Sequence, residues 1–299
     1  MKALVTGING FVGPYLKDHL LKNGIQVFGM DINQGADVNF TCDLLDRQAI
    51  FEAVKSSRPD LLFHLAGQSS DKLSFAKPEL TFNVNVLGTK NILDAVRASS
   101  PDCRILIVSS ANIYGIPVKV PLTEQSRVSP ISPYGESKLK QEELTLSYGL
   151  SSVIVRTFPH TGPGQIPIFV CSDLAKQAAE AEAGKRDEIC VGNTQVERDF
   201  SDVRDIVRAY LLAVQKCRCN EIYNVCSGKS YSVGNVFEIL KSLISKDIKL
   251  LEKKEKKRER DILILSGDNS KFVKQTGLKP EISFEKTLGD LLDYWRQRI

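Results

Sequence analysis

The sequence predicts an α/β protein built on a doubly wound parallel sheet. Short apolar runs alternate with amphipathic segments from the first residue onward, and strands that alternate with helices imply βαβ units. A chain of 299 residues is long enough for one large domain or two modest ones with a sizeable core. Hydrophobic residues make up 42% and charged residues 25% of the chain, which excludes collagen-like, coiled-coil and largely disordered classes.

The expected elements follow in chain order. The predicted strands are 3–6, 26–30, 61–65, 104–108 and 153–156, and the predicted helices are 15–23, 48–56, 80–98 and 134–148. After Arg156 the rhythm breaks, because residues 158–165 are rich in Pro and Gly. We therefore predict a first domain over 1–156 and a smaller C-terminal α/β substrate-binding domain over 157–299. Residues 221–226 are a further predicted strand, which we expect to return to the first sheet.

Three glycines stand between the first strand and the first helix. Gly7, Gly10 and Gly13 are spaced G-x-x-G-x-x-G. Without Cβ atoms the backbone can turn tightly and approach a pyrophosphate, whose charge is attracted by the amides at the helix N-terminus. The strand-turn-helix setting predicts the dinucleotide site of a Rossmann domain. The remaining residues of this turn that we expect to contact the dinucleotide are Asn9, Phe11 and Val12.

An acidic residue follows the second strand. Asp31 comes roughly 20 residues after the glycines, the separation at which a carboxylate meets the adenosine ribose. That carboxylate accepts a hydrogen bond from a 2′-hydroxyl and repels a 2′-phosphate. No Arg stands beside it, since Ile32 and Asn33 follow, and the sequence favours NAD(H) over NADP(H). Asp43 is a candidate adenine contact, and an exposed loop aspartate is the alternative.

A tyrosine and a lysine form a candidate proton relay. Tyr134 and Lys138 are four residues apart, so on a helix they project from one face, a turn apart. An adjacent ammonium and an oxidised nicotinamide would stabilise the phenolate and lower the pKa of Tyr134. Ser110 ends a predicted strand, where its hydroxyl can orient a substrate carbonyl. His64, inside an apolar strand, is better interpreted as a core histidine than as a catalyst.

These motifs resemble those of the extended short-chain dehydrogenases/reductases that modify nucleotide sugars. The resemblance covers nearly the whole chain and implies a tyrosine acid/base, a lysine on the nicotinamide ribose and a serine that polarises the reacting carbonyl. It also implies dinucleotide contacts in the loops after later strands, at Asp43, Leu44, Leu65, Ala66 and Gly67, and further dinucleotide contacts from Tyr134 and Lys138. The matching segments are 6–13, Asp31, Asp43, 64–67, 85–89, 109–115, Tyr134 with Lys138, 156–165 and 198–205.

Within that family the chain looks most like the GDP-4-keto-6-deoxy-D-mannose reductases, by segments 156–165, 169–177 and 198–205 and by its length. The 4,6-dehydratases carry an acid two positions after the Ser/Thr, and Asn112 stands there in this chain. An amide is a poor general base, which disfavours dehydration. The expected activity is reduction of a nucleoside-diphosphate 4-keto-6-deoxyhexose with NAD(P)H. An NAD-dependent nucleotide-sugar 4-epimerase is the alternative.

Four residues are candidate substrate contacts: Asn112, His160, Arg198 and Arg258. Guanidinium groups suit paired phosphate oxygens, which recommends the two arginines for the diphosphate. Arg258 is equally well interpreted as part of the solvated basic run 253–260, and His160 as a cap on the Pro/Gly turn. The family usually has Asn where this chain has Pro159, which leaves the identity of the sugar open.

Composition sets the remaining expectations. Seven scattered cysteines and three histidines predict neither a disulfide framework nor a metal site, and they suit a reducing cytoplasm. No apolar run approaches the length of a membrane helix, and a net charge of +4 with one local basic run does not indicate nucleic-acid binding. The resemblance implies a homodimer formed through the helices over 80–98 and 134–148.

Overall fold

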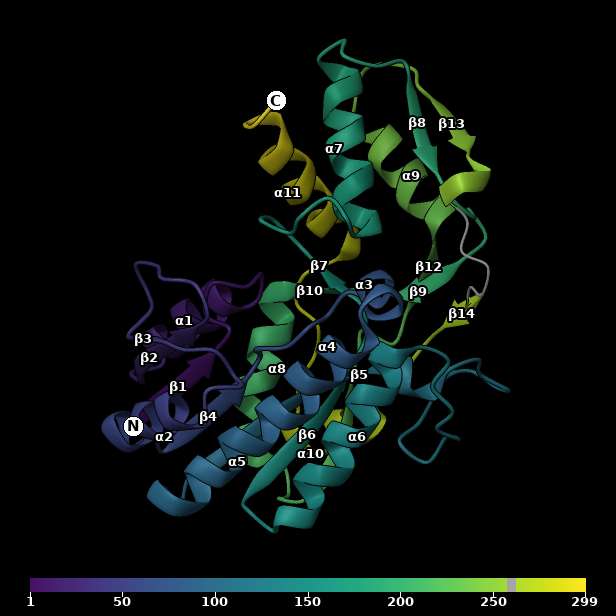
Figure 1. Ribbon diagram of the computed structural model, residues 1–299. Helices are drawn as coiled ribbons and strands as arrows, with labels where there is room; N and C mark the ends of the chain where they lie inside the picture. The colour runs from purple at the N-terminus through teal and green to yellow at the C-terminus, as the bar shows by residue number, and fades with distance from the viewer. Residues whose placement is uncertain (257–261) are drawn as a thin grey trace.

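The computed structural model describes residues 1–256 and 262–299, and its central feature is a seven-stranded sheet (Figure 1). The strand order is β3-β2-β1-β4-β5-β6-β11, and every neighbouring pair is parallel. This confirms the predicted doubly wound α/β class. The strands are β1 (Lys2–Thr6), β2 (Gln26–Asp31), β3 (Phe40–Thr41), β4 (Leu61–His64), β5 (Arg104–Ser110), β6 (Ser152–Thr157) and β11 (Glu221–Val225).

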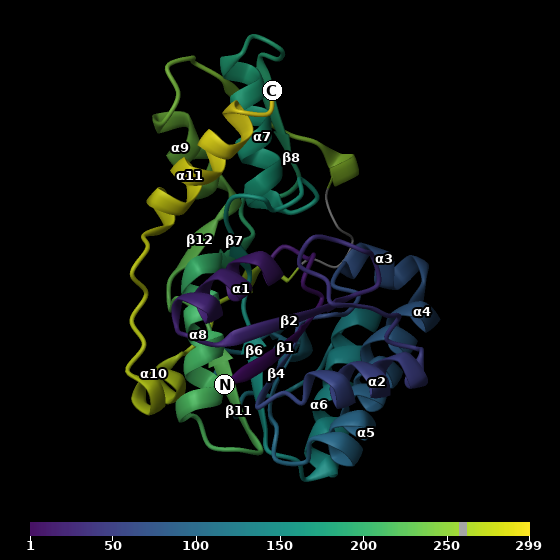
Figure 2. The same ribbon diagram turned by 90° about the vertical axis from the view of Figure 1, so that its left-hand side faces the viewer.

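Helices cover both faces of the sheet, as Figure 2 shows with the sheet between them. On one face lie α1 (Gly13–Lys22), α8 (Val203–Lys216) and α10 (Ser270–Thr276); on the other lie α2 (Arg47–Ser57), α5 (Gly88–Ser99) and α6 (Pro133–Tyr148). Successive side chains of a strand enter opposite cores, so that Ala3 and Val5 pack toward α1 and α8 while Leu4 packs toward α2 and α5. Burial on both faces explains why these strands are continuously apolar.

The predicted helix over 80–98 is interrupted in the structure. It consists of α4 (Pro78–Phe82), a π-helical turn η1 (Asn83–Leu87) and α5, preceded by the short α3 (Asp71–Ala76). Single π turns are frequent at functional sites, because they rotate side chains out of the regular helical register. This one carries Asn85, whose side chain is fully buried.

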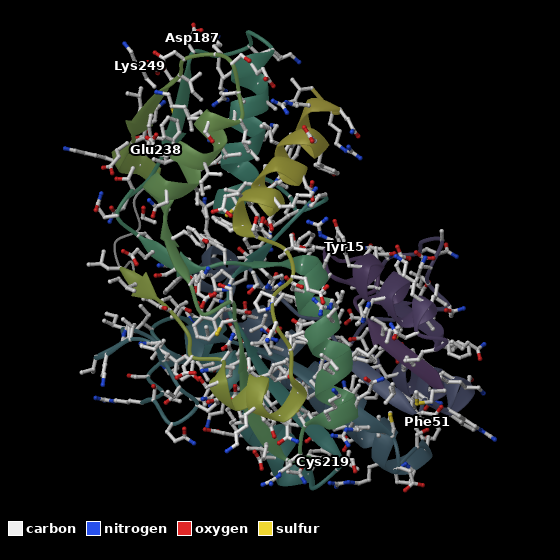
Figure 3. All side chains as sticks on the ribbon, turned by 180° about the vertical axis from the view of Figure 1, so that it is seen from behind. Tyr15, Phe51, Asp187, Cys219, Glu238 and Lys249 are labelled. Carbon is white, nitrogen blue, oxygen red and sulfur yellow. The ribbon has the colours of Figure 1, made fainter. Side chains whose placement is uncertain are left out.

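A second lobe stands above the carboxyl ends of the strands and has its own core. Its helices are α7 (Val170–Glu182), α9 (Val233–Ser242) and α11 (Phe284–Arg296). Its described residues form three small sheets. One pairs β7 (His160–Thr161) with β10 (Ser201–Asp202), one pairs β9 (Glu197–Asp199) with β12 (Ser230–Ser232) and β14 (Ile264–Leu265), and one pairs β8 (Glu188–Val191) with β13 (Lys249–Glu252). Two short 3₁₀ helices, η2 (Ala111–Tyr114) and η3 (Lys254–Lys256), complete the secondary structure of residues 1–256 and 262–299. Figure 3 labels Asp187 and Lys249 at the far end of this lobe and Tyr15 at the junction of the two lobes.

The chain crosses between the lobes more than once. β11 pairs with β6 from Glu221↔Val153 to Val225↔Thr157, and α8 packs in the core of the first sheet. Residues 203–225 therefore lie with the first sheet although they follow Arg156. The linear division at residue 156 stays a prediction.

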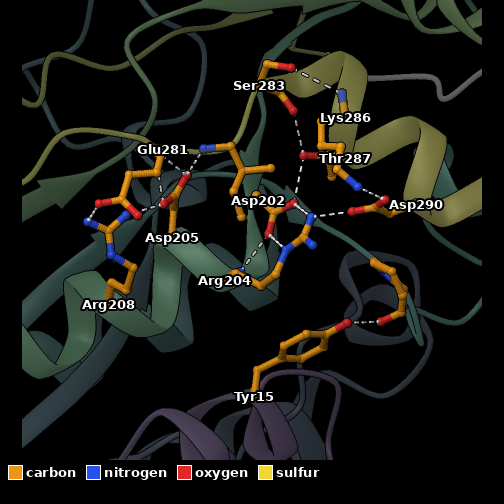
Figure 4. A network of polar contacts seen from close by, with 12 residues as sticks. Tyr15, Asp202, Arg204, Asp205, Arg208, Glu281, Ser283, Lys286, Thr287 and Asp290 are labelled. Carbon is orange, nitrogen blue, oxygen red and sulfur yellow. Dashed lines mark hydrogen bonds and ion pairs between the residues drawn. The ribbon is translucent and has the colours of Figure 1, made fainter. Parts of the chain in front are cut away.

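A polar network fastens the lobes together (Figure 4). Asp202 caps α8, pairs with Arg204 at 2.7 Å, and accepts a hydrogen bond of 2.7 Å from Thr287 on α11. Arg204 also contacts Asp290 of α11 at 2.8 Å. On the other side of the junction the Tyr15 hydroxyl donates to the carbonyl of Pro163 at 2.7 Å. The second lobe is thereby held over the edge of the sheet where ligands bind in doubly wound folds.

The described residues include no helix with both the length and the apolar character needed to span a bilayer.

Candidate active site

The loops that follow β1 and β4 leave the sheet at its switch point. Strand order reverses there, since β2 and β3 lie on one side of β1 and β4 to β6 lie on the other. Ligands of doubly wound sheets bind outside the carboxyl ends of the strands at such a point. The glycine-rich turn follows β1, and Leu65, Ala66 and Gly67 follow β4, so both predicted dinucleotide-binding segments meet at this position.

The glycine-rich turn has the geometry of a phosphate cradle. Gly7 has φ +73°, and a Cβ there would lie 2.9 Å from the backbone N and Cα of Ala66. A Cβ on Gly13 would lie 2.1 Å from the carbonyl oxygen of Ile8. Backbone packed this closely tolerates no side chain, and it exposes amide groups at the start of α1 to an anion. These residues fit the pyrophosphate of a nicotinamide dinucleotide.

We expect Gly13→Ala to weaken NADH binding at least about tenfold, because the new methyl group forces the start of α1 away from the turn. Titration of NADH fluorescence measures the dissociation constant. Gly289→Ala is the matched control, since a Cβ at Gly289 in α11 meets only a leucine methyl at 3.9 Å and should leave NADH binding unchanged. Equal affinity of the two variants for NADH would contradict the assignment of the glycine-rich turn as the site that binds the pyrophosphate.

Asp31 organises the end of β2. Its carboxylate accepts hydrogen bonds of 3.0 Å from the backbone N–H groups of Asn9 and Asn33. The Asn9 side chain donates to the Asn33 carbonyl at 2.8 Å, which ties the glycine-rich turn to the loop after β2. Asp43 is exposed and accepts from the backbone of Leu45 at 2.9 Å. The neighbouring Leu44 is buried, and its Cβ packs so close to Gly88 that a Cβ added to this glycine would lie only 2.8 Å away.

The three predicted catalytic residues come together from two elements. Ser110 ends β5 and caps η2 by accepting from the Asn112 backbone at 3.2 Å. Tyr134 and Lys138 lie one turn apart on α6, which begins with Ser132 as its N-cap and a proline in its first turn. All three are at most 9% exposed, and the Ser110 hydroxyl lies close enough to the Tyr134 phenol to influence its pKa.

Opposing influences act on the pKa of Tyr134 in the protein alone. Burial raises the pKa of this phenol, the neighbouring Ser110 lowers it, and the charge of Asp71 raises it again, so that the cost of removing a phenolate from water dominates. The lowering expected from Lys138 together with an oxidised nicotinamide stays a prediction. A raised pKa keeps Tyr134 protonated at neutral pH, the state in which it can donate a proton.

Lys138 is held by acceptors of its own protein. Its ammonium donates to the Val108 carbonyl at 2.9 Å and to Oε1 of Gln141 at 3.0 Å. Burial lowers the pKa of Lys138 to about 8, although the charge of Glu142 opposes this shift. A Cβ on Gly67 would lie 3.8 Å from Nζ, so the missing side chain leaves room beside the ammonium.

Two supporting groups received no role from the sequence, although Asn85 and Arg156 lie in segments that carry the family resemblance. Asn85 joins both walls of the site: it accepts from the Gln68 backbone at 2.8 Å, and its amide donates to Ser137 on α6 at 2.9 Å. Glu142 and Arg156 form a buried pair at 2.8 Å, with side chains 3% and 5% exposed. The sequence signal for the buried pair was available on α6, where the polar residues Gln141 and Glu142 follow Lys138 by three and four positions and so share its helical face.

The predicted substrate residues occupy different surroundings. Asn112 is half-buried in η2, directly after Ser110 and Ala111. His160 binds the Phe158 carbonyl at 3.1 Å and stacks on Phe11 of the glycine-rich turn, with ring centroids 6.1 Å apart and planes 10° apart. His160 therefore lies where the second lobe meets the dinucleotide segment. His64 is buried and bonded to Thr6 and Thr89, so it is the core histidine that the sequence predicts.

The two candidate arginines have different outcomes. The Arg198 guanidinium, on β9, donates to the carbonyls of Glu197 and Ile262 at 2.8 and 2.6 Å. It helps to hold β14 against β9 in this structure. Arg258 lies outside the described residues. Among those residues, no group of three His, Cys, Asp or Glu side chains is arranged to hold a metal ion.

Two cavities lie away from the catalytic residues. One of about 330 Å³ lies beside α7 and is lined by Pro167, Asp173, Lys176, Gln177, Glu180, Arg186, Cys190 and Lys253. The other, of about 460 Å³, lies between α8, β11 and the segment that leads into α11.

The fold and the site define a dinucleotide-dependent α/β enzyme of the short-chain dehydrogenase/reductase type. A family model described as GDP-mannose 4,6 dehydratase matches residues 4–291. The chain belongs to this family, whose relatives include reductases, dehydratases and epimerases of nucleotide sugars.

Individual relatives match over their full length. GDP-6-deoxy-D-mannose reductase of Pseudomonas aeruginosa is 30% identical, with 100% of this chain and 98% of the relative covered. The solved structure of RMD from Pseudomonas aeruginosa complexed with NADPH superposes with a TM-score of 0.91 at 30% identity, covering 100% and 99% of the two chains. The Thermus thermophilus UDP-glucose 4-epimerase complex with NAD gives 0.88 at 27% identity and covers 100% of both.

Proposed function

We propose that the protein reduces the C4 ketone of a nucleoside-diphosphate 4-keto-6-deoxyhexose, with GDP-4-keto-6-deoxy-D-mannose as the first substrate to test. The single observation that carries the proposal is that the buried Ser110 and Tyr134 meet, one helical turn from Lys138, at the carboxyl ends of the parallel strands. Asn112, in place of a dehydratase acid, supports reduction over dehydration, since an amide does not act as a general base. The similarity to GDP-6-deoxy-D-mannose reductase supports the substrate.

Each residue has a defined role in this reaction. When bound, NADH supplies the hydride that reduces C4. The Tyr134 phenol donates its proton to O4, and the Ser110 hydroxyl orients and polarises the ketone. The Lys138 ammonium stabilises the phenolate that remains and bonds the nicotinamide ribose beside Gly67. The protein thus supplies the proton and the positive charge, and the product is a C4 alcohol.

Absorbance at the NADH band tests the proposal directly. Purified protein mixed with GDP-4-keto-6-deoxy-D-mannose should oxidise one NADH for each sugar reduced. Sugar that stays unchanged, or that is converted without NADH oxidation, would remove the reductase assignment. UDP- and dTDP-linked 4-keto sugars in the same assay identify the preferred nucleotide.

We propose NAD(H) as the preferred dinucleotide, and Asp31 as the residue that sets the preference. The carboxylate repels a 2′-phosphate, so kcat/KM for NADH should exceed that for NADPH at least about tenfold. Asp31→Ser should reduce this ratio toward one. Asp43→Ser is the matched control: it changes a carboxylate proposed to contact adenine, which both dinucleotides share, and should leave the ratio unaltered. A wild-type preference for NADPH would refute the role of Asp31.

A 4-epimerase is the second candidate, favoured by the close superposition on an epimerase that binds NAD. An epimerase returns the hydride to the sugar and needs no net reductant. Protein that is purified with a bound dinucleotide and converts UDP-glucose without added NADH would support this alternative.

We propose that the substrate site extends into the second lobe. We also propose that the protein acts as a homodimer and that it works in a reducing cytoplasm. The cavity beside α7 is lined by three basic and two acidic side chains, and Glu180 pairs with Lys176 at 3.3 Å and with Arg186 at 2.7 Å. Lys253 is the basic group there that we propose for a nucleoside diphosphate. Exposed apolar side chains on α4 and η1, next to α6, suit a contact between two copies: Leu80, Phe82 and Leu87. The seven free cysteines suit a reducing compartment.

A further inference from the structure

We propose that Gln141 is a positioning residue that fixes the Lys138 ammonium and holds it in its charged form. The inference rests on the proposed function, in which Lys138 stabilises the phenolate of Tyr134. It is drawn from the hydrogen bonds around Gln141, which is fully buried on α6 three residues after Lys138.

The orientation of the Gln141 amide is determined by its neighbours. Its Nε2 donates to the Thr89 hydroxyl oxygen at 2.6 Å, while its Oε1 accepts from Lys138 at 3.0 Å. Thr89 cannot donate in return, because its own proton is used on the Asn85 carbonyl at 2.7 Å. A flipped amide would place its NH₂ group against the ammonium. Thr89 therefore forces the amide oxygen toward Lys138.

Thr89 is itself fixed by His64, which lies on β4. His64 Nε2 lies 3.0 Å from the Thr89 oxygen, and because Thr89 has no proton left, this nitrogen must be the donor. His64 Nδ1 then accepts from the Thr6 hydroxyl at 2.8 Å, and Thr6 accepts from the Ala66 backbone at 3.1 Å. The chain of bonds runs from Lys138 to the loop after β4, and every member is consistent with a single arrangement of protons.

This arrangement directs the remaining donor of Lys138. The ammonium has three N–H groups, and among the described residues two of them bond the Val108 carbonyl and the Gln141 oxygen. The space beside Nζ is the one kept open by Gly67. With two bonds fixed, the third N–H group points to a defined position, which the proposed function assigns to the ribose.

The groups around Lys138 show why Gln141 matters for its charge. Burial lowers the pKa of Lys138 to about 8. Loss of a hydrogen-bond acceptor would therefore bring this pKa into the physiological pH range. His64 does not compete for protons, since burial lowers the pKa of His64 to about 3. The other charged or titratable groups that face this region are Tyr134 and Glu142 on α6, Arg156 on β6, Asp71 on α3, Tyr114 on η2 and Tyr210 on α8.

Two near-isosteric variants test the inference by moving one pKa in opposite directions. Gln141→Met removes the acceptor and should lower the pKa of Lys138 by about one unit, while Gln141→Glu places a carboxylate there and should raise it by a similar amount. The ¹³Cε resonance of labelled lysine reports this pKa, assigned by its absence in Lys138→Met. Thr145→Val is the matched control, because Thr145 is buried on α6 and bonds only the Gln141 carbonyl within the helix.

The activity profile supplies a second measurement. The alkaline limb of the reductase pH profile should move to lower pH in Gln141→Met and to higher pH in Gln141→Glu, and should stay in place in Thr145→Val. Folded variants in which the Lys138 resonance titrates as in the wild type, or moves in one direction in both, would overturn the inference. The resonance titration needs no substrate, so it decides the role of Gln141 even if the protein proves not to be a reductase.

Discussion

Replacing Tyr134 with Phe is expected to lower kcat of the reductase reaction by about 10²- to 10⁴-fold, the contribution of a positioned general acid. The phenol lies beside Ser110, and burial keeps it protonated at neutral pH by raising its pKa. Phe keeps the ring and its packing but has no proton to donate. Steady-state NADH oxidation measures kcat, and NADH fluorescence measures binding.

Binding of NADH should change much less than kcat in this variant, because most of the proposed dinucleotide contacts come from other residues, including Lys138 and the glycine-rich turn. Tyr223→Phe is the matched control: Tyr223 is also buried, on β11, and its hydroxyl accepts a hydrogen bond of 3.1 Å from the backbone N–H of Arg218, which precedes that strand. Unchanged turnover in Tyr134→Phe would show that another group donates the proton, and would remove the central chemical claim.

The second large effect is expected from breaking the buried pair of Arg156 and Glu142. Glu142→Gln should lower the free energy of unfolding by about 3–5 kcal/mol, because it leaves a guanidinium buried without its carboxylate. The carboxylate is bonded by Nε and Nη2 of Arg156 and also accepts from Ser109. Chemical denaturation at pH 7 measures the change.

An exposed pair on the same helix provides the comparison. Lys140 and Glu143 are 2.7 Å apart, with side chains 56% and 52% exposed. Glu143→Gln should cost at most about 1 kcal/mol, because water already solvates both charges. Equal losses in the two variants would contradict the claim that burial of Arg156 and Glu142 gives their pair its large effect.

The glycine-rich turn and the alternation of strands and helices could be predicted from the sequence because both are local. A glycine at φ +73°, such as Gly7, is required by the turn itself, and the apolar runs reflect strands buried on both faces. The Tyr134–Lys138 pair was also predictable, since a spacing of four places two side chains on one face of a helix. The interruption of the helix at η1 had no local signal.

The effect of burial on the pKa of Tyr134 was not predictable in this way. Sequence spacing places an ammonium near the phenol but does not report how much water remains around it. Burial removes that water and raises the pKa, and only the packing of α6 against its neighbours decides the extent.

By itself, the sequence determined the fold class and the position of the glycine-rich turn, and it predicted the proton-relay residues. The tertiary structure decided which distant polar groups surround Lys138. Thr6, His64 and Thr89 come from β1, β4 and α5, and they meet Gln141 only because parallel strand pairing places β1 beside β4 under that helix. Hydrogen bonds between groups far apart in the chain depend on this pairing, which no local pattern encodes.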